Sequence, residues 1–157
     1  MALVAAATAA PAKYRPTGAD LLHKIDRLGA PAVLEDDFNL DGGPGYAVVE
    51  TGSADGVAVA VKLLTTVADA AYSEGLQSSL GVALQRHPEN VLPLVDSASV
   101  LAADHICLPW MIESPHQKVR DELTKTRAAL DTASAKAYPA QRAACLMQIK
   151  RAEMGVR

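Results

Sequence analysis

Val57-Ala-Val-Ala-Val-Lys-Leu-Leu64 is the stretch on which the predicted fold class depends. Valine and alanine alternate in it, and a period of two is that of a strand, whose successive side chains point to opposite faces. The Asp55-Gly56 pair just before it suits a tight hairpin. Two further strands are predicted upstream, over 33–40 and 46–50. Residues 33–64 are therefore expected to form three strands.

Helical patterns flank this region. Leu21 and Ile25 belong to an apolar stripe that predicts a helix over 18–28, with Thr17 as N-cap and Gly29 as its end. Further helices are predicted over 65–86, 117–130 and 139–154, and further strands over 91–97 and 105–111. This order predicts an α+β fold, in which one helix packs across a five-stranded antiparallel sheet and two helices follow at the C-terminus.

Length and composition exclude several classes of protein. A chain of 157 residues fits one domain, and no apolar run is long enough to span a membrane. The net charge of -3 and the aromatic content of 4% argue against a nucleic-acid partner.

The compartment is predicted from cysteine usage and from the N-terminus. Cys107 and Cys145 lie in apolar stretches without C-x-x-C spacing, which predicts buried reduced thiols and a cytoplasmic location. The alanine-rich residues 1–12 contain neither Arg nor Ser, so they are a weak organelle-targeting signal.

Four segments follow one another in a characteristic order. They are Gly43-Pro-Gly-Tyr-Ala-Val-Val49, Val59-Ala-Val-Lys62, His87-Pro-Glu-Asn-Val-Leu-Pro-Leu-Val-Asp96 and Ile106-Cys-Leu-Pro-Trp-Met111. Together they resemble the N-terminal lobe of a eukaryotic protein kinase, and the last two are similar to the Numb-associated group. The resemblance divides the chain into an N-terminal extension with a short helix (1–32), a kinase-like small lobe (33–112) and a helical segment that looks like the start of the large lobe (113–157).

The resemblance implies an ATP site. A glycine loop would let backbone N–H groups approach the phosphates, and a lysine on the strand below would add a positive charge. Apolar residues would cover the adenine, and a gatekeeper and a hinge would lie beside it. The residues implied for nucleotide contact are Gly43, Gly45, Tyr46, Val49, Ala60, Lys62, Leu108, Trp110 and Met111.

Catalysis by this chain is not expected. The sequence has no H-R-D-x-x-x-x-N and no D-F-G motif, so it offers no catalytic residue and no ligands for Mg²⁺. The predicted function is a serine/threonine-kinase-like, ATP-binding module that stops before the catalytic loop, as in a pseudokinase or a truncated kinase.

The alternative is a structural or regulatory adaptor that keeps the kinase-derived fold without binding nucleotide. The C-terminal helices carry apolar faces that need cover, either from the predicted sheet or from a protein partner. The residues on these faces are Leu123, Leu130, Tyr138, Leu146 and Ile149.

A further motif lies between residues 37 and 42. Asp37-Phe-Asn-Leu-Asp-Gly42 matches the first half of an EF-hand loop. Position twelve of that loop should be a bidentate Glu, and here it is Val48. We therefore expect an acidic turn and no metal site.

Overall fold

The computed structural model describes residues 15–39, 42–66, 70–108 and 115–155. These ranges contain helices and no strand, and their one β-type contact is an isolated bridge between Asp96 and Ala102. The predicted α+β fold with a five-stranded antiparallel sheet was therefore wrong. The predicted resemblance to a kinase N-terminal lobe was also wrong, because that lobe is built on a five-stranded sheet.

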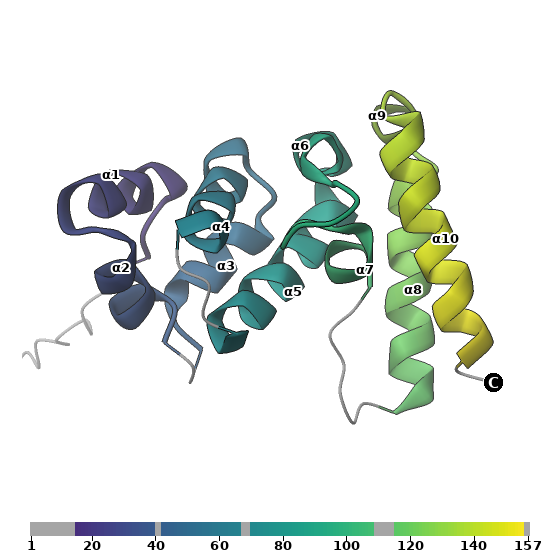
Figure 1. Cartoon of the computed structure of the whole chain (residues 1–157), viewed down its shortest axis with the longest axis horizontal. Coiled ribbons are helices and arrows are strands. Elements are labelled where there is room, and N and C mark those ends of the chain that lie inside the picture. The colour runs from purple at the N-terminus through teal and green to yellow at the C-terminus, as the bar shows by residue number, and fades with distance from the viewer. Residues whose placement is uncertain (1–14, 40–41, 67–69, 109–114, 156–157) are drawn as a thin grey trace, which may run out of the picture.

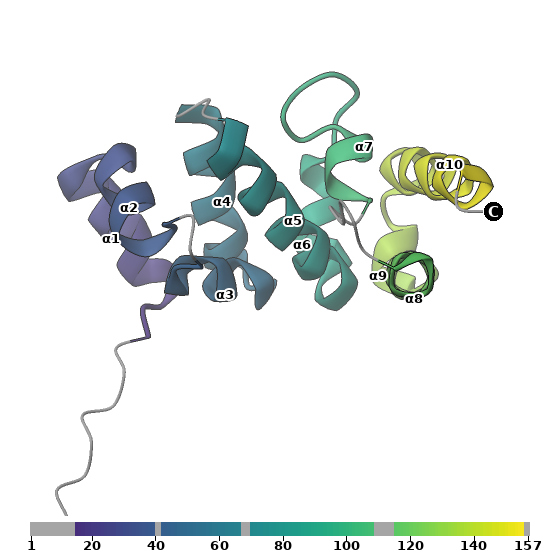
Figure 2. The same ribbon diagram turned by 90° about the horizontal axis from the view of Figure 1, so that it is seen from below.

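The helices follow one another along the long axis of the molecule (Figure 1). They are α1 (Gly18–Leu28), α2 (Ala30–Asp37), α3 (Pro44–Glu50), α4 (Ala54–Thr66), α5 (Ala70–Arg86), α6 (Pro88–Val91), the 3₁₀ helix η1 (Leu92–Leu94), α7 (Ala103–Ile106), α8 (His116–Leu130), α9 (Ala133–Lys136) and α10 (Pro139–Gly155). Helix α1 packs on α4, α3 on α5, α5 on α8, and α8 on α10. The result is a row of helical layers, with α1 and α2 at one end and α8 and α10 at the other (Figures 1 and 2).

Residues 57–64 lie in α4. The buried residues of this helix are Gly56, Val57, Val59, Ala60, Leu63 and Leu64. Many of these positions are three or four apart, so the stretch fits a helix as well as a strand. Helix α4 packs on α1, α3 and α5, and a helix with neighbours on several sides can be apolar around most of its surface.

The other predicted strands are helical as well. Residues 33–37 belong to α2, residues 46–50 to α3, residues 91–94 to α6 and η1, and residues 105–106 to α7. Residues 109–111 of the last predicted strand lie outside the described residues. Each of these apolar runs is short, and a short apolar run fits either secondary structure.

The predicted helices are confirmed where local signals mark their ends. Helix α1 spans the predicted 18–28: the Asp20 N–H donates to Thr17 Oγ1 (3.2 Å), and the Thr17 N–H donates to the Asp20 carboxylate (2.9 Å). Gly29 ends the helix at φ 85°, a conformation that glycine adopts without strain. Helices α8 and α10 begin and end within one residue of their predicted bounds, whereas α5 begins at Ala70 instead of 65.

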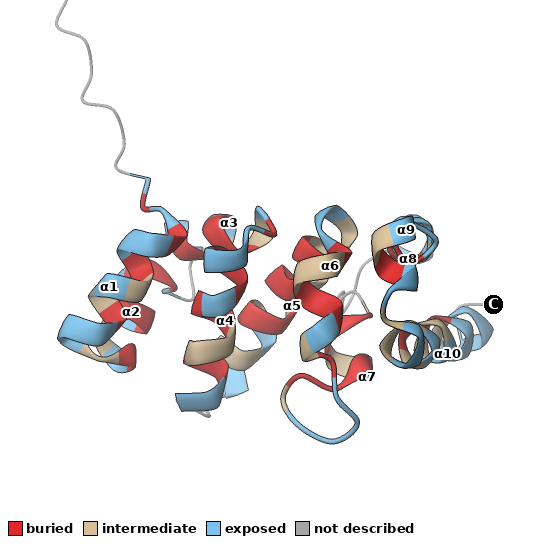
Figure 3. Cartoon of the chain, turned by 90° about the horizontal axis from the view of Figure 1, so that it is seen from above, coloured by how far each residue is buried: buried red, intermediate tan, exposed pale blue. Residues whose placement is uncertain are grey.

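The core lies between successive layers (Figure 3). The predicted stripe of α5, which comprises Leu76, Leu80 and Leu84, is buried. Leu123, Leu130 and Ile149 of the C-terminal helices are also buried, at 1%, 0% and 0% exposure. Helices α8 and α10 pack on each other, α8 on α5 and α10 on α7, so the chain itself covers these three side chains.

A disulfide joins Cys107, just after α7, to Cys145 of α10. The two Cα atoms are 5.3 Å apart, within the usual range for a bridge, and both residues are buried. The prediction of reduced thiols was therefore wrong. It had been based on sequence spacing, and only the packing of α10 on α7 brings two cysteines 38 positions apart together.

Candidate functional site

Gly43, Gly45 and Tyr46 were predicted to form a phosphate loop, and they lie at the start of α3. A Cβ on Gly43 would lie 2.2 Å from the Asp37 carbonyl oxygen, and a Cβ on Gly45 would lie 2.5 Å from the ring of Phe38. Both glycines therefore let α3 approach the end of α2. The described residues form no glycine hairpin above a lysine-bearing strand, so the kinase-like function was wrong.

The remaining predicted nucleotide contacts are spread over several environments. Val49 and Ala60 are fully buried in the core. Lys62, on α4, is 42% exposed and forms an ion pair with Asp26 of α1, which lowers the pKa of the Asp26 carboxyl. Leu108 is half-buried after α7. Trp110 and Met111 lie outside the described residues. The structure does not test ATP binding, which stays a prediction.

Gly43→Ala is expected to lower the free energy of unfolding by about 1–3 kcal/mol, because its Cβ would overlap the backbone of Asp37. Gly155→Ala is the matched control, since a Cβ there meets nothing within 4 Å, and we expect a change of less than about 0.5 kcal/mol. Guanidinium unfolding followed by circular dichroism measures both. Equal stability of the two variants would contradict the packing role of Gly43.

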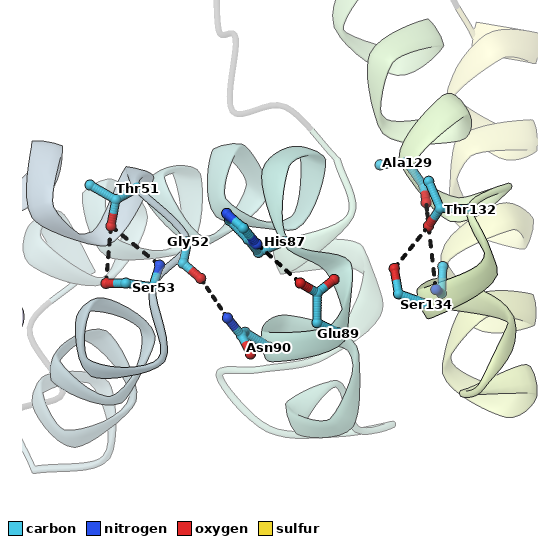
Figure 4. Close-up of polar contacts among 10 residues, drawn as sticks. Thr51, Gly52, Ser53, His87, Glu89, Asn90, Ala129, Thr132 and Ser134 are labelled. Atoms are coloured by element: carbon cyan, nitrogen blue, oxygen red, sulfur yellow. Dashed lines mark hydrogen bonds and ion pairs between the residues drawn. The ribbon is translucent and has the colours of Figure 1, made fainter.

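A row of polar side chains links the loops at one edge of the helical layers (Figure 4). This polar edge comprises Thr51, Gly52, Ser53, His87, Glu89, Asn90, Thr132 and Ser134. Asn90 Nδ2 donates to the Gly52 carbonyl oxygen at 2.8 Å, and His87 Nδ1 lies 3.0 Å from Glu89 Oε1. The Asn90 contact thereby joins the α3–α4 connection to helix α6.

The polar edge brings together a serine, a histidine and a glutamate, the residue types of a hydrolytic triad. A triad needs the hydroxyl beside the histidine, so that the imidazole can take its proton. Here the Ser134 hydroxyl hydrogen-bonds to the Thr132 hydroxyl (3.2 Å), and His87 contacts Glu89 instead. The backbone N–H of Glu89 and the His87 side chain lower the pKa of the Glu89 carboxyl. The order of contacts therefore does not support nucleophilic catalysis, and the polar groups satisfy one another.

The contact between Asn90 and Gly52 provides a stability test of this edge. Asn90→Asp keeps the shape of the side chain but points an acceptor at the Gly52 carbonyl, so we expect a loss of about 1–3 kcal/mol at neutral pH. Protonation of the introduced carboxylate removes this repulsion, because a carboxylic acid O–H can donate a hydrogen bond to the Gly52 carbonyl. The difference in the free energy of unfolding between the variant and the parent protein should therefore become smaller as the pH falls from 7 to 4. Urea unfolding at several pH values measures this difference. A difference that is constant or grows in acid would contradict the assigned contact.

A groove of about 370 Å³ lies between the segment 95–104 and α10. The residues that line it are small or apolar, apart from a rim of acids, amides and one serine. They are Val95, Asp96, Ser97, Ala102, Ala103, Asp104, Ala140, Gln141, Ala144, Met147 and Gln148. Figures 2 and 3 show α7 and α10 side by side, as their packing contacts require.

Both walls of the groove are held in place. The Asp96 carboxylate accepts hydrogen bonds from the N–H groups of Ala98 (3.1 Å) and Ser99 (2.9 Å) and from the Ser99 hydroxyl, which shapes the loop before α7. Cys145, adjacent to the lining residue Ala144, is bridged to Cys107 at the end of α7. The disulfide thus ties the α7 wall to the α10 wall, and the groove is organised before any ligand arrives.

The described lining of the groove combines apolar side chains with acidic ones. Met147 is 48% exposed and lines the groove together with Ala140 and Ala144 of the same helix. Among the lining residues that the structure describes, Asp96 and Asp104 are the charged ones, and both are acidic. Hydrogen bonds from Ser99 lower the pKa of the Asp96 carboxyl, which keeps it ionised.

No three His, Cys, Asp or Glu side chains of the described residues cluster in a way that could hold a metal ion. Asp37, the first residue of the motif resembling an EF-hand, forms an ion pair with Lys24 at 2.7 Å. Over the same described part of the chain, no helix is both long and apolar enough to cross a bilayer.

Comparison of the chain with protein-family models, curated proteins and solved structures found no match. The groove must therefore be interpreted from its own geometry. Sequence analysis missed it because its two walls lie some 40 residues apart along the chain. One local signal was present: Met147 and Met154 are seven residues apart on α10, hence on one helical face, and both are exposed.

Proposed function

We propose that the chain is a protein-binding module and that its groove holds an apolar segment of a partner protein. The observation that carries the proposal is Met147, half-exposed in a concave, largely apolar groove whose walls are fixed by a disulfide. Preorganised apolar concavities with a few polar groups at the rim are typical of binding sites. Methionine adapts its shape to an incoming side chain at low cost.

The proposal keeps the partner predicted from the sequence but changes the reason for it. The chain itself buries Leu123, Leu130 and Ile149, so these residues do not require a partner. The groove side of α10 is different, because Met147 is open to solvent. The polar edge is a weaker candidate, because its side chains already hydrogen-bond to one another.

The disulfide also bears on the compartment. Structural disulfides persist in oxidising compartments and are rare in the cytosol. The cytoplasmic prediction was based on reduced thiols, and it loses that support now that the cysteines are paired. We propose that the module works where thiols are oxidised.

Selection of short random peptides displayed on phage, with the oxidised chain immobilised, tests the proposal. Enriched peptides, once synthesised, should shift amide resonances of residues 95–104 and 140–148 in ¹H–¹⁵N spectra. Met147→Asn should weaken this binding, because it replaces an apolar contact in the groove with a polar amide that carries no charge. Leu28→Asn is the matched control, since Leu28 is equally exposed, at 49%, and lies on α1 at the other end of the row. Failure to enrich any peptide, or shifts confined to another surface, would contradict the proposal.

A further inference from the structure

We infer that the segment bound in the groove carries a lysine or arginine next to its apolar side chain. This inference rests on the proposed function and adds the chemistry of the ligand. Its basis is the charge of the groove: the described residues that line it include two carboxylates and no basic side chain.

The two carboxylates differ in what they can still bind. Asp96 is already engaged by Ser99 and by the backbone of its own loop. Asp104 is exposed on α7, and within the described part of the chain no hydrogen bond or ion pair occupies its carboxylate. Asp104 is therefore the group that would receive the cation, and Asp96 adds to the negative potential around it.

The cations of the neighbouring helices do not neutralise this rim. Arg142, on α10, donates to the Leu130 carbonyl oxygen at 2.6 Å and to Asp131 at 2.7 Å. Lys150 and Arg151 lie further along α10 and do not line the groove. A ligand that buries a neutral segment here would desolvate Asp104 without compensation, whereas a cationic side chain would pair with it.

Two phage libraries that differ only beside one fixed leucine provide the test. In one library lysines flank the leucine, and in the other glutamines flank it. We expect enrichment of the lysine library. Its synthesised peptides should bind with an affinity about three- to tenfold lower to Asp104→Asn than to the parent protein, and the difference should shrink at high salt. Glu35→Gln is the matched control, because it removes one exposed carboxylate from α2 and should leave the affinity unchanged.

Each outcome decides between the two claims. Equal enrichment of the libraries, with peptide shifts in the groove and no effect of Asp104→Asn, would overturn the cationic ligand and leave the binding module standing. Enrichment of neither library, or binding insensitive to Met147→Asn, would overturn the binding module and the inference together. Equal losses in Asp104→Asn and Glu35→Gln would show general charge attraction and would also overturn the inference.

Discussion

Reduction of the Cys107–Cys145 disulfide is expected to lower the free energy of unfolding by about 4 kcal/mol. The bridge spans 38 residues, and opening it returns to the unfolded chain the conformational freedom that this loop closure removes. For a chain of this length such a loss corresponds to roughly 10 °C in melting temperature.

Guanidinium unfolding of the oxidised and the dithiothreitol-treated protein measures this effect. The Cys107→Ala/Cys145→Ala double variant serves as control: it should be less stable than the oxidised protein and insensitive to the reductant. Because the bridge ties the walls of the groove, the reduced protein should also bind the selected peptides less tightly. An unfolding midpoint that does not change on reduction would contradict the stabilising role of the disulfide.

Phe38→Ala is expected to lower the free energy of unfolding by about 3–5 kcal/mol, the range for removal of a fully buried aromatic side chain. The ring of Phe38 meets the ring of Tyr46 edge-on, with centroids 5.1 Å apart, and the Tyr46 hydroxyl donates to the Phe38 carbonyl oxygen at 2.9 Å. Gly45 lies against the same ring. The cavity would therefore open where α2 meets α3.

Urea unfolding compares Phe38→Ala with Leu28→Ala, a control at an exposed position that should change stability by less than about 0.5 kcal/mol. A double-mutant cycle makes the test sharper. Gly45→Ala should destabilise the parent protein but cost little in Phe38→Ala, because the missing ring leaves room for the new Cβ. Additive effects of the two substitutions would contradict the assigned contact between Gly45 and Phe38.

Glycine 43 illustrates why the site could not be predicted. A glycine in a sequence can indicate a position where there is no room for a side chain. The sequence does not show which neighbouring group occupies that space. The kinase resemblance assigned that space to phosphate oxygens, and the fold fills it with the Asp37 carbonyl. Only the neighbouring backbone distinguishes these two cases.

The groove could not be predicted from the sequence for a related reason. Asp104 and Met147 belong to helices that meet only because α10 packs on α7. Neither residue lies in a recognisable motif, and the two cysteines that tie the walls carry no spacing signature. A site assembled from distant, individually ordinary residues leaves no local pattern.

Local signals sufficed where a helix end depends on its own residues. The box of Thr17 and Asp20, the stop at Gly29 and the leucine stripe of α5 were all readable, because caps and 3.6-residue periodicity act within one or two turns.

Local sequence patterns were therefore enough to predict α1, α8, α10 and most of α5. Packing against the neighbouring helices decided that residues 57–64 form a helix. A short run of valine and alanine is compatible with either a helix or a strand until those neighbours are in place. Tertiary packing also decided the pairing of the cysteines and the position of the groove, because both require helices far apart in the chain to pack together.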